Sequence, residues 1–308
     1  MYECIINPNA QSGQGRRIWE ETEKELKRKS CAFRAFFTEG PGHATALARQ
    51  ITADGGPHTL LVLGGDGTVN EVLSGICVPP QTTLGYVPAG SSNDFARGLG
   101  LPQNPRKALE IILKSEKLRG VDAGILRCPG TSRRFAVSSG IGYDAAICHQ
   151  VSVSRLKKLL NRLHLGKLAY VGVSLDRLVR CRPGKMKLQL DDSRNLSFRK
   201  AYFATAMNLP CEGGGCYFCP DASPSDGLLD VIVVADIPKW RALILLPLVF
   251  SGAHKNCRGV HIYRCRKVRI QSEKPLPVHA DGEPVAPCHQ VKMELEKNGI
   301  SVIVSDNS

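Results

Sequence analysis

The sequence lacks an apolar run long enough to cross a membrane as a helix. Its longest apolar stretch, residues 242–250, is interrupted by Pro247 and covers less than half of the roughly 20 residues that a bilayer span requires. The N-terminus carries no signal peptide, and its pattern predicts a strand instead, Tyr2-Glu-Cys-Ile-Ile6. We therefore expect a cytoplasmic protein that associates with membranes only peripherally.

Signatures of metal-binding and nucleic-acid-binding modules are also missing. Cys216 and Cys219 have the spacing of a zinc-ligand pair, but no second such pair completes a site. The twelve cysteines are expected to be reduced thiols, because no secretory segment precedes them. The basic region lacks interleaved aromatic residues, so we do not expect a nucleic-acid partner.

Positive charge is abundant but unevenly distributed. The formal net charge is +13, from 41 basic and 28 acidic residues. Residues 1–122 contribute 14 basic and 13 acidic side chains, so residues 123–308 carry the other 27 and 15, a net +12. Residues 153–165 predict a basic amphipathic helix that suits an anionic bilayer, and a helix packed on its own domain explains them equally well.

The most informative stretch is residues 60–73. Four apolar residues, 60–63, predict a buried parallel strand, which runs into Gly64-Gly-Asp-Gly-Thr68 and then a helix. Such a strand–glycine–helix junction is a preformed phosphate site. Asp66 implies Mg²⁺ or proton transfer, because a carboxylate beside a phosphate is otherwise repulsive. An ordinary Asp-Gly turn is the alternative.

The first 124 residues repeat this strand–loop–helix pattern. Residues 7–15 form a Gly/Ser/Asn loop before a helix over 16–30, and strands follow at 33–37 and 83–87. The last strand ends in Pro88-Ala-Gly-Ser-Ser-Asn-Asp-Phe-Ala96, and a final helix covers 105–118. The series predicts a parallel sheet whose ligand site lies at the carboxyl ends of the strands.

The second half predicts an antiparallel β-rich domain that begins near Gly124. Its expected strands are residues 135–138, 185–190, 199–207, 228–234, 260–270 and 291–295. Helical patterns interrupt them over 144–173 and 238–251. The domains are therefore residues 1–124 and 125–295, and it stays open whether the tail 296–308 completes the first.

Several motifs together resemble the diacylglycerol kinase catalytic family, in its bacterial lipid kinase branch related to sphingosine kinases. They are Gly64-Gly-Asp-Gly-Thr68 with Asn70-Glu71, Pro88 to Ala96, Asn7-Pro with Ser12-Gly-Gln-Gly15, Ser139-Gly-Ile-Gly-Tyr-Asp144, Pro220 to Asp230, and Asp281-Gly-Glu283. The resemblance implies an N-terminal doubly wound, Rossmann-like nucleotide domain and a C-terminal antiparallel β-sandwich. ATP and Mg²⁺ would bind in the cleft between them.

The resemblance also implies roles for particular residues. Asp281 would be the general base for a lipid hydroxyl, assisted by Asp66 and Glu283. Asp66, Asp94, Asp122 and Glu283 would organise catalytic Mg²⁺, and Asp226 with the Leu228 carbonyl would hold a structural Mg²⁺. The nucleotide would contact Asn7, Ser12, Thr38, Thr45, Gly64, Gly65, Asp66, Gly67, Thr68, Glu71, Ser92 and Asn93.

The sequence leaves three functional alternatives. Diacylglycerol is the expected acceptor, but phosphatidylglycerol, a monoacylglycerol or a sphingoid base would need the same apolar slot. An NAD kinase shares the Gly64–Thr68 motif, although Gly90-Ser-Ser-Asn-Asp94 does not match its second motif. Because the related kinases often have Gly-Thr-Gly-Asn-Asp there, a non-catalytic lipid- or nucleotide-binding regulator is the third. A homodimer is also left open.

Overall fold

The computed structural model describes residues 1–153 and 175–305, and the chain divides into two compact units. Unit 1 comprises residues 1–123 and 297–308, and unit 2 comprises residues 124–296. Residues 154–165 of the predicted basic helix lie outside the described residues. Within the described part of the chain, no helix is long and apolar enough to cross a bilayer.

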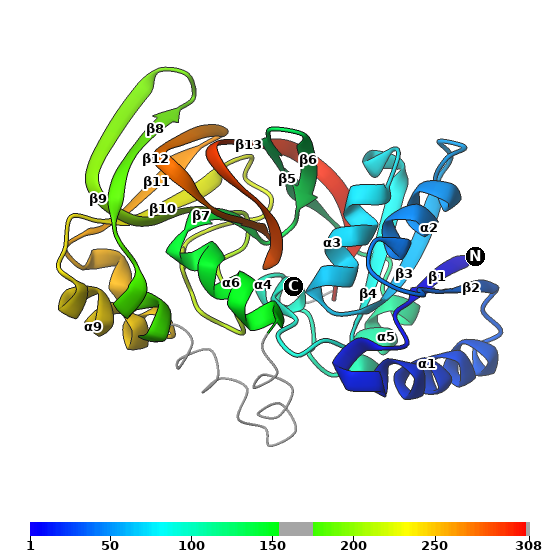
Figure 1. Ribbon diagram of the computed structural model, residues 1–308. Helices are drawn as coiled ribbons and strands as arrows, with labels where there is room; N and C mark the ends of the chain where they lie inside the picture. Colours follow the sequence, from blue (N-terminus) through cyan, green and yellow to red (C-terminus); the bar gives the residue numbers. More distant parts are fainter. Residues whose placement is uncertain (154–174, 306–308) are drawn as a thin grey trace. The chain divides into compact units, whose positions relative to one another are not determined.

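Unit 1 is built on a parallel sheet with the strand order β2-β1-β3-β4-β13 (Figure 1). Its strands are β1 (Tyr2–Ile6), β2 (Phe33–Phe37), β3 (His58–Gly64), β4 (Thr82–Pro88) and the end of β13 (Glu283–Ile303). Leu60, Leu61 and Leu63 of β3 are fully buried, because helices cover both faces of the sheet. The tail supplies the last strand, since Ser301 pairs with Thr83.

The helices of unit 1 alternate with its strands, as the pattern predicted. They are α1 (Ala10–Arg28), α2 (His43–Ile51), α3 (Asp66–Gly75), the 3₁₀ turn η1 (Pro79–Gln81), α4 (Asp94–Gly98) and α5 (Pro105–Lys114). Trp19 of α1 and Leu109 of α5 share a core cluster with Leu61 and Leu63 of β3. Helices α2 and α3 pack together on the opposite face (Figure 1).

Helix α1 begins at Ala10, so the prediction of a loop through residue 15 was wrong. Gly15 lies inside the helix, and a Cβ there would be 2.1 Å from the carbonyl oxygen of Asn7. Gly13 has a φ of +99°, which relaxes the first turn. Gly15 thus serves close packing of the helix start against the residue that follows β1.

Unit 2 is antiparallel and β-rich, as predicted. Its strands are β5 (Leu118–Cys128, of which the part from Gly124 belongs here), β6 (Thr131–Phe135), β7 (Ser138–Gly142), β8 (Gly184–Leu190), β9 (Arg194–Met207), β10 (Leu229–Ala235), β11 (Val260–Cys265), β12 (Lys267–Ala280) and the first part of β13. Both β7 and β8 pair with β9 and with β12, at different points along each. The strands thereby enclose an apolar core that includes Leu188, Ile270 and Val278.

The helices of unit 2 are α6 (Tyr143–Val153), α9 (Lys239–Val249) and the 3₁₀ turn η2 (Ala253–Asn256), with a short helical segment over residues 175–180. Helix α9 forms where the sequence predicted a helix over 238–251. Its buried side chains, Ala242 and Leu245, belong to a second core cluster with Ile232 and Leu178.

The ring of His58, at the start of β3, links two carboxylates. Its nitrogens lie 2.8 Å from Glu3 Oε2 and 2.7 Å from Asp54 Oδ1. The hydrogen bond to Asp54, followed by that to Glu3, raises the pKa of His58 even though partial burial opposes it. The protonated ring therefore stabilises the folded state.

We expect this stabilisation to be lost on the alkaline side of neutrality. A raised folded-state pKa means that the contribution is complete below the unfolded value, about 6.5, and disappears as pH rises through the folded value. His58→Gln should therefore flatten the fall in the free energy of unfolding between pH 6 and 9, by about 1 kcal/mol or less. Thermal unfolding followed by circular dichroism tests this, and equal pH slopes in both proteins would contradict it.

Candidate active site

The β3–α3 junction is a glycine turn in which side chains would not fit. Strand β3 ends at Gly64 and α3 begins at Asp66. A Cβ on Gly64 would lie 2.5 Å from the Cβ and Oγ1 of Thr68, in the first turn of the helix. The backbone of the turn is thus folded tightly onto the start of α3, which is the arrangement that lets N–H groups approach an anion.

The loop after β4 touches this turn directly. A Cβ on Gly90 would lie 2.6 Å from the Cα of Gly65, and the Ala89 N–H donates to the Gly64 carbonyl at 2.7 Å. The two predicted nucleotide loops therefore pack backbone to backbone, at the carboxyl ends of neighbouring parallel strands.

Gly90→Ala should separate these two loops. The added methyl group would overlap the backbone of Gly65, which cannot move aside as a flexible side chain could. We expect nucleotide affinity to fall by about tenfold or more, because a displacement of about 1 Å at such a site is costly. Isothermal titration with ATP and Mg²⁺ measures this.

Gly56→Ala is the control for the loss of a glycine in unit 1, because the nearest atoms to a Cβ there would be the Asp54 carboxylate oxygens at 3.5 Å, an ordinary contact. Equal affinities of Gly90→Ala and wild type would contradict the prediction.

Asn93 fixes the shape of the second loop. Its Oδ1 accepts the Gly90 N–H at 2.8 Å and the Tyr86 hydroxyl at 3.2 Å, and its Nδ2 donates to the Gly90 carbonyl at 3.1 Å. Asn93 has a φ of +50°, which asparagine tolerates better than most residues. The neighbouring Ser92 is half-buried. The described contacts of the Asn93 amide are therefore with Gly90 of the loop and with Tyr86 of β4.

Two carboxylates meet around a buried phenol. Asp66 Oδ1 accepts the Phe95 N–H at 3.0 Å, which joins the start of α3 to α4, and Asp94 is buried at the start of α4. Burial raises the pKa of Tyr86 well above its ordinary value, and the charges of Asp66 and Asp94 raise it further. Arg97 Nε lies 3.8 Å from Asp94 Oδ1 and supplies positive charge there, and carboxylate oxygens are also the donors that Mg²⁺ prefers. The fully buried Asp122 lies on β5.

The end of β1 adjoins the same turn. Asn7 Nδ2 donates to Thr68 Oγ1 at 3.1 Å, and the Asn7 backbone N–H donates to the Leu63 carbonyl at 2.9 Å. Asn7 thus reaches the first turn of α3 from the neighbouring strand. For Ser12 the structure describes only the backbone, within α1.

Glu71 and Thr45 form a separate contact between α2 and α3. The Glu71 carboxylate accepts the N–H groups of Gly42 at 2.9 Å and Ala44 at 3.2 Å, and the Thr45 hydroxyl donates to the Glu71 carbonyl at 2.9 Å. Glu71 therefore caps the N-terminus of α2. Thr38, the residue that follows β2, is buried.

Asp281 occupies a two-residue hairpin between β12 and β13. Ala280 pairs with Glu283, and Asp281 and Gly282 have φ values of +49° and +77°. This is the tight turn that an Asp-Gly pair typically forms. Asp281 is half-buried on the turn and Glu283 is exposed just after it.

Three consecutive backbone N–H groups hold the Asp281 carboxylate. Oδ2 accepts from Ala136 at 2.8 Å, and Oδ1 accepts from Val137 at 2.8 Å and Ser138 at 3.0 Å. The prediction of one strand over residues 135–138 was therefore wrong. These N–H groups donate to the carboxylate instead of to a neighbouring strand, so the stretch forms the connection between β6 and β7.

Behind the turn lies a buried polar network that the sequence did not reveal. The Gly282 N–H donates to His279 Nδ1 at 3.2 Å, so His279 Nε2–H donates to Asp144 Oδ2 at 2.8 Å, and the Thr205 hydroxyl donates to the same oxygen at 3.0 Å. Burial opposes ionisation of Asp144, but His279 and Thr205 hold its pKa below the ordinary value. Each residue lies in or beside a motif, since Asp144 ends the stretch 139–144 and His279 lies two residues before Asp281, but nothing local in the sequence pairs them.

Asp226 lies elsewhere in unit 2, within a group of acidic side chains. Its Oδ1 accepts the Leu228 N–H at 3.0 Å, and Arg264 pairs with both Asp226 and Asp230. Burial raises the pKa of Asp230 to about 6, Arg264 partly opposes this rise, and Asp226 and Asp221 add to it. These oxygen donors fit a hard cation such as Mg²⁺, and in this structure Arg264 supplies positive charge beside them.

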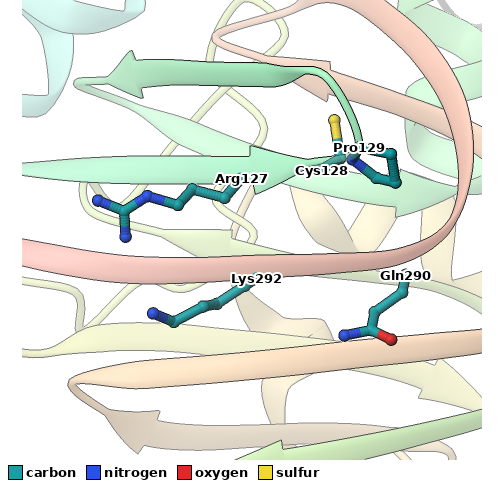
Figure 2. Close-up of a pocket in the computed structure, with 5 residues that line it drawn as sticks. All are labelled: Arg127, Cys128, Pro129, Gln290 and Lys292. Carbon is teal, nitrogen blue, oxygen red and sulfur yellow. The ribbon is translucent and has the colours of Figure 1, made fainter.

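A shallow cavity of about 310 Å³ in unit 2 contains none of the predicted site residues (Figure 2). Its lining residues are Arg127, Cys128, Pro129, Gln290 and Lys292. Arg127 and Lys292 both pair with Glu294 on β13, so their charges are partly neutralised. We do not assign this cavity to the active site.

The chain is similar to known proteins over almost its whole length. Residues 2–125 match the family model of the diacylglycerol kinase catalytic domain, and residues 136–304 match that of the YegS C-terminal NAD kinase beta sandwich-like domain. YtlR of Bacillus subtilis (strain 168), which bears a provisional lipid-kinase name, is 32% identical, with 91% of this chain and 92% of that protein covered. A diacylglycerol kinase of Mycobacterium tuberculosis (strain H37Rv) is 31% identical, with 75% of this chain and 72% of that protein covered.

Solved structures show the same fold. A crystal structure of a Bacillus anthracis (strain Sterne) protein, provisionally named a diacylglycerol kinase, has a TM-score of 0.77 and 23% identity, and 99% of this chain and 95% of that chain are covered. An NAD kinase of Archaeoglobus fulgidus in complex with ATP has a TM-score of 0.54 and 14% identity, with 100% and 95% covered. The predicted combination of a nucleotide domain and a β-sandwich-like domain is confirmed.

Proposed function

Because this chain belongs to the diacylglycerol kinase catalytic-domain family, with a second domain of the YegS C-terminal type, we propose that it is an ATP-dependent lipid kinase that phosphorylates diacylglycerol. The observation that carries the proposal is the likeness to lipid kinases across both domains, rather than to a nucleotide-binding domain alone. The product would be phosphatidic acid, with ADP released.

The residues of unit 1 suit the binding of a triphosphate. The packed turns at Gly64–Gly65 and Gly90 present backbone at the ends of β3 and β4, and Asp66 and Asp94 stand beside them. When bound there, Mg²⁺ would neutralise negative charge on the phosphates. Asp66 and Asp94 would hold it, largely through water, and the helix dipole of α3 would add a favourable field.

Asp281 would take the proton from the lipid alcohol. As the hydroxyl oxygen forms its bond to the γ-phosphorus, the bond to ADP breaks and the proton passes to the Asp281 carboxylate. The three N–H groups of residues 136–138 fix the orientation of that carboxylate, and the His279–Gly282 contact fixes the turn.

A product-identified assay tests the substrate. The full chain is incubated with radiolabelled ATP, Mg²⁺ and one acceptor at a time: diacylglycerol, phosphatidylglycerol, monoacylglycerol, sphingosine or NAD⁺. Labelled phosphatidic acid, identified by mass, is expected with diacylglycerol. A labelled product with another lipid alone would keep a lipid kinase but overturn this acceptor. A product with NAD⁺ alone, or with none of the five, would overturn the proposal.

A further inference from the structure

The outer face of helix α9 is an apolar stripe in contact with solvent. The exposed positions recur at helical spacing, and we call them the α9 stripe: Trp240, Leu243, Ile244, Pro247 and Phe250. Trp240 is 58% exposed and Ile244 is 55% exposed, whereas Ala242 and Leu245 on the other face are buried in the core of unit 2. A contiguous exposed apolar stripe of this kind marks an interaction surface.

The segment 175–182 lies beside α9 and extends this surface (Figure 1). Leu178 is buried in the same core cluster as Ala242 and Leu245, and Lys239 Nζ donates to the Val179 carbonyl. The Val179 side chain is 73% exposed. Apolar side chains from two neighbouring segments therefore face solvent together.

The surroundings of the stripe are basic. Residues 175–182 and 236–250 contain five basic side chains, Arg177, Arg180, Arg182, Lys239 and Arg241, against two acidic ones, Asp176 and Asp236, a net of +3. Asp176 is paired with Arg180, and the Arg241 guanidinium lies 5.0 Å from the centre of the Trp240 ring. Tryptophan and cationic side chains are the residues that anchor helices at a bilayer interface.

We infer that the α9 stripe inserts into the interfacial layer of a bilayer that contains anionic lipids. The apolar side chains would enter the layer between headgroups and acyl chains, and the basic side chains would contact anionic headgroups. A second copy of the chain fits less well, because a two-fold contact would bring the same basic side chains of both copies together. The inference deepens the proposed function, since a lipid alcohol resides in a bilayer, but membrane docking needs no catalysis.

The two tryptophans allow a direct test. Trp19 is buried, with 4% exposure, and Trp240 is exposed. In Trp19→Phe, therefore, the fluorescence reports on the α9 stripe alone. Vesicles of phosphatidylcholine with phosphatidylglycerol, added without nucleotide, should shift this emission to shorter wavelength, and brominated lipids should quench it. Trp240→Phe is the matched control, in which Trp19 should not respond.

Three results would overturn the inference. They are unchanged Trp240 emission when the protein co-sediments with vesicles, an equal response with pure phosphatidylcholine at high salt, and a concentration-dependent shift without vesicles, which would indicate a second copy. If Trp19→Phe fails to fold by circular dichroism, wild-type co-sedimentation is compared with Leu243→Ser/Ile244→Ser. This variant should lower the vesicle partition coefficient by about tenfold or more, and equal coefficients would overturn the inference.

A substitution in unit 1 controls for the loss of apolar surface. Leu118 is 51% exposed at the start of β5, and Leu118→Ser should leave partitioning unchanged. The double variant should also phosphorylate monomeric short-chain diacylglycerol at the wild-type rate and lose activity only on vesicles. If the wild type phosphorylates no lipid alcohol, the proposed function fails, whereas the Trp240 response still decides the docking surface by itself.

Discussion

Asp281→Asn is expected to lower kcat for lipid phosphorylation by about 10²- to 10⁴-fold, the range that a general base contributes. The substitution removes the carboxylate that would accept the hydroxyl proton. ATP affinity should remain within about twofold of the wild-type value, because Asp281 belongs to unit 2, whereas the glycine turns belong to unit 1. Steady-state kinetics with diacylglycerol vesicles and isothermal titration with ATP give the two numbers.

The local structure allows this variant to fold. An asparagine Oδ1 can still accept the N–H groups of Val137 and Ser138, whereas its Nδ2 is a donor and cannot accept the Ala136 N–H. Asparagine also tolerates the positive φ of the Asp281 turn. A loss of kcat with an unchanged thermal midpoint would therefore reflect chemistry rather than unfolding.

Asp192→Asn is the matched control for that experiment. Asp192 also lies in a tight hairpin turn of unit 2, between β8 and β9, with a φ of +58°. The control thus makes the same chemical change in the same kind of backbone conformation, at a residue without a predicted role. If Asp281→Asn retains more than about a tenth of the wild-type kcat, Asp281 is not the general base. If the wild type itself phosphorylates none of the acceptors, a regulatory binding protein becomes the better interpretation.

The sequence predicted the parts of the fold that depend on neighbouring residues. The apolar run 60–63 followed by glycines predicted a buried parallel strand and a helix, and β3 and α3 are there. The hairpin turn at Asp281-Gly282 is local in the same sense, because the positive φ values that it needs are favoured by an Asp-Gly pair.

The features that sequence reasoning missed depend on contacts between distant residues. Residues 135–138 have the composition of a strand, but the strand is interrupted there because the backbone N–H groups donate to a carboxylate about 145 positions away. His279 and Asp144 are 135 positions apart and meet only when β12 packs on α6. No local pattern contains that pairing, so only the tertiary structure reveals it.

The roles predicted for individual site residues divide in the same way. The glycine turns of unit 1 were expected to bind phosphate, and the structure adds that they contact each other through Gly65 and Gly90. Glu71 and Asn93 were expected to bind nucleotide, whereas their described hydrogen bonds hold loops and a helix start. Resemblance transfers positions between related proteins, but the partner of each polar atom depends on this chain's own packing.

Asp66→Asn should separate the charge of Asp66 from its structural contact. Asp66 Oδ1 accepts the Phe95 N–H, and an asparagine oxygen can accept it equally, so the link between α3 and α4 should persist. The substitution removes the negative charge. If Asp66 helps to hold Mg²⁺, kcat/KM should fall by about 10²-fold or more, because stabilisation of charge in the transition state is lost.

The dependence of the rate on Mg²⁺ concentration distinguishes this role from a structural one. Weaker cation binding should move half-maximal activity of Asp66→Asn to higher Mg²⁺, by about tenfold or more, since a charged oxygen ligand has been replaced by a neutral one. Asp66→Ala should resemble it in Mg²⁺ dependence but unfold at a lower temperature, because it also loses the bond to Phe95.

Asp54→Asn provides the control in the same unit. Asp54 Oδ1 accepts the Gly56 N–H at 3.0 Å in an exposed turn, so the substitution makes the same change of charge away from the glycine turns. Its Mg²⁺ dependence should match that of the wild type. If Asp66→Asn shows wild-type kcat/KM and wild-type Mg²⁺ dependence while Asp66→Ala loses stability, then Asp66 only joins α3 to α4. The cation would then have to be held without the acidic residue that made the Gly64–Thr68 motif stand out.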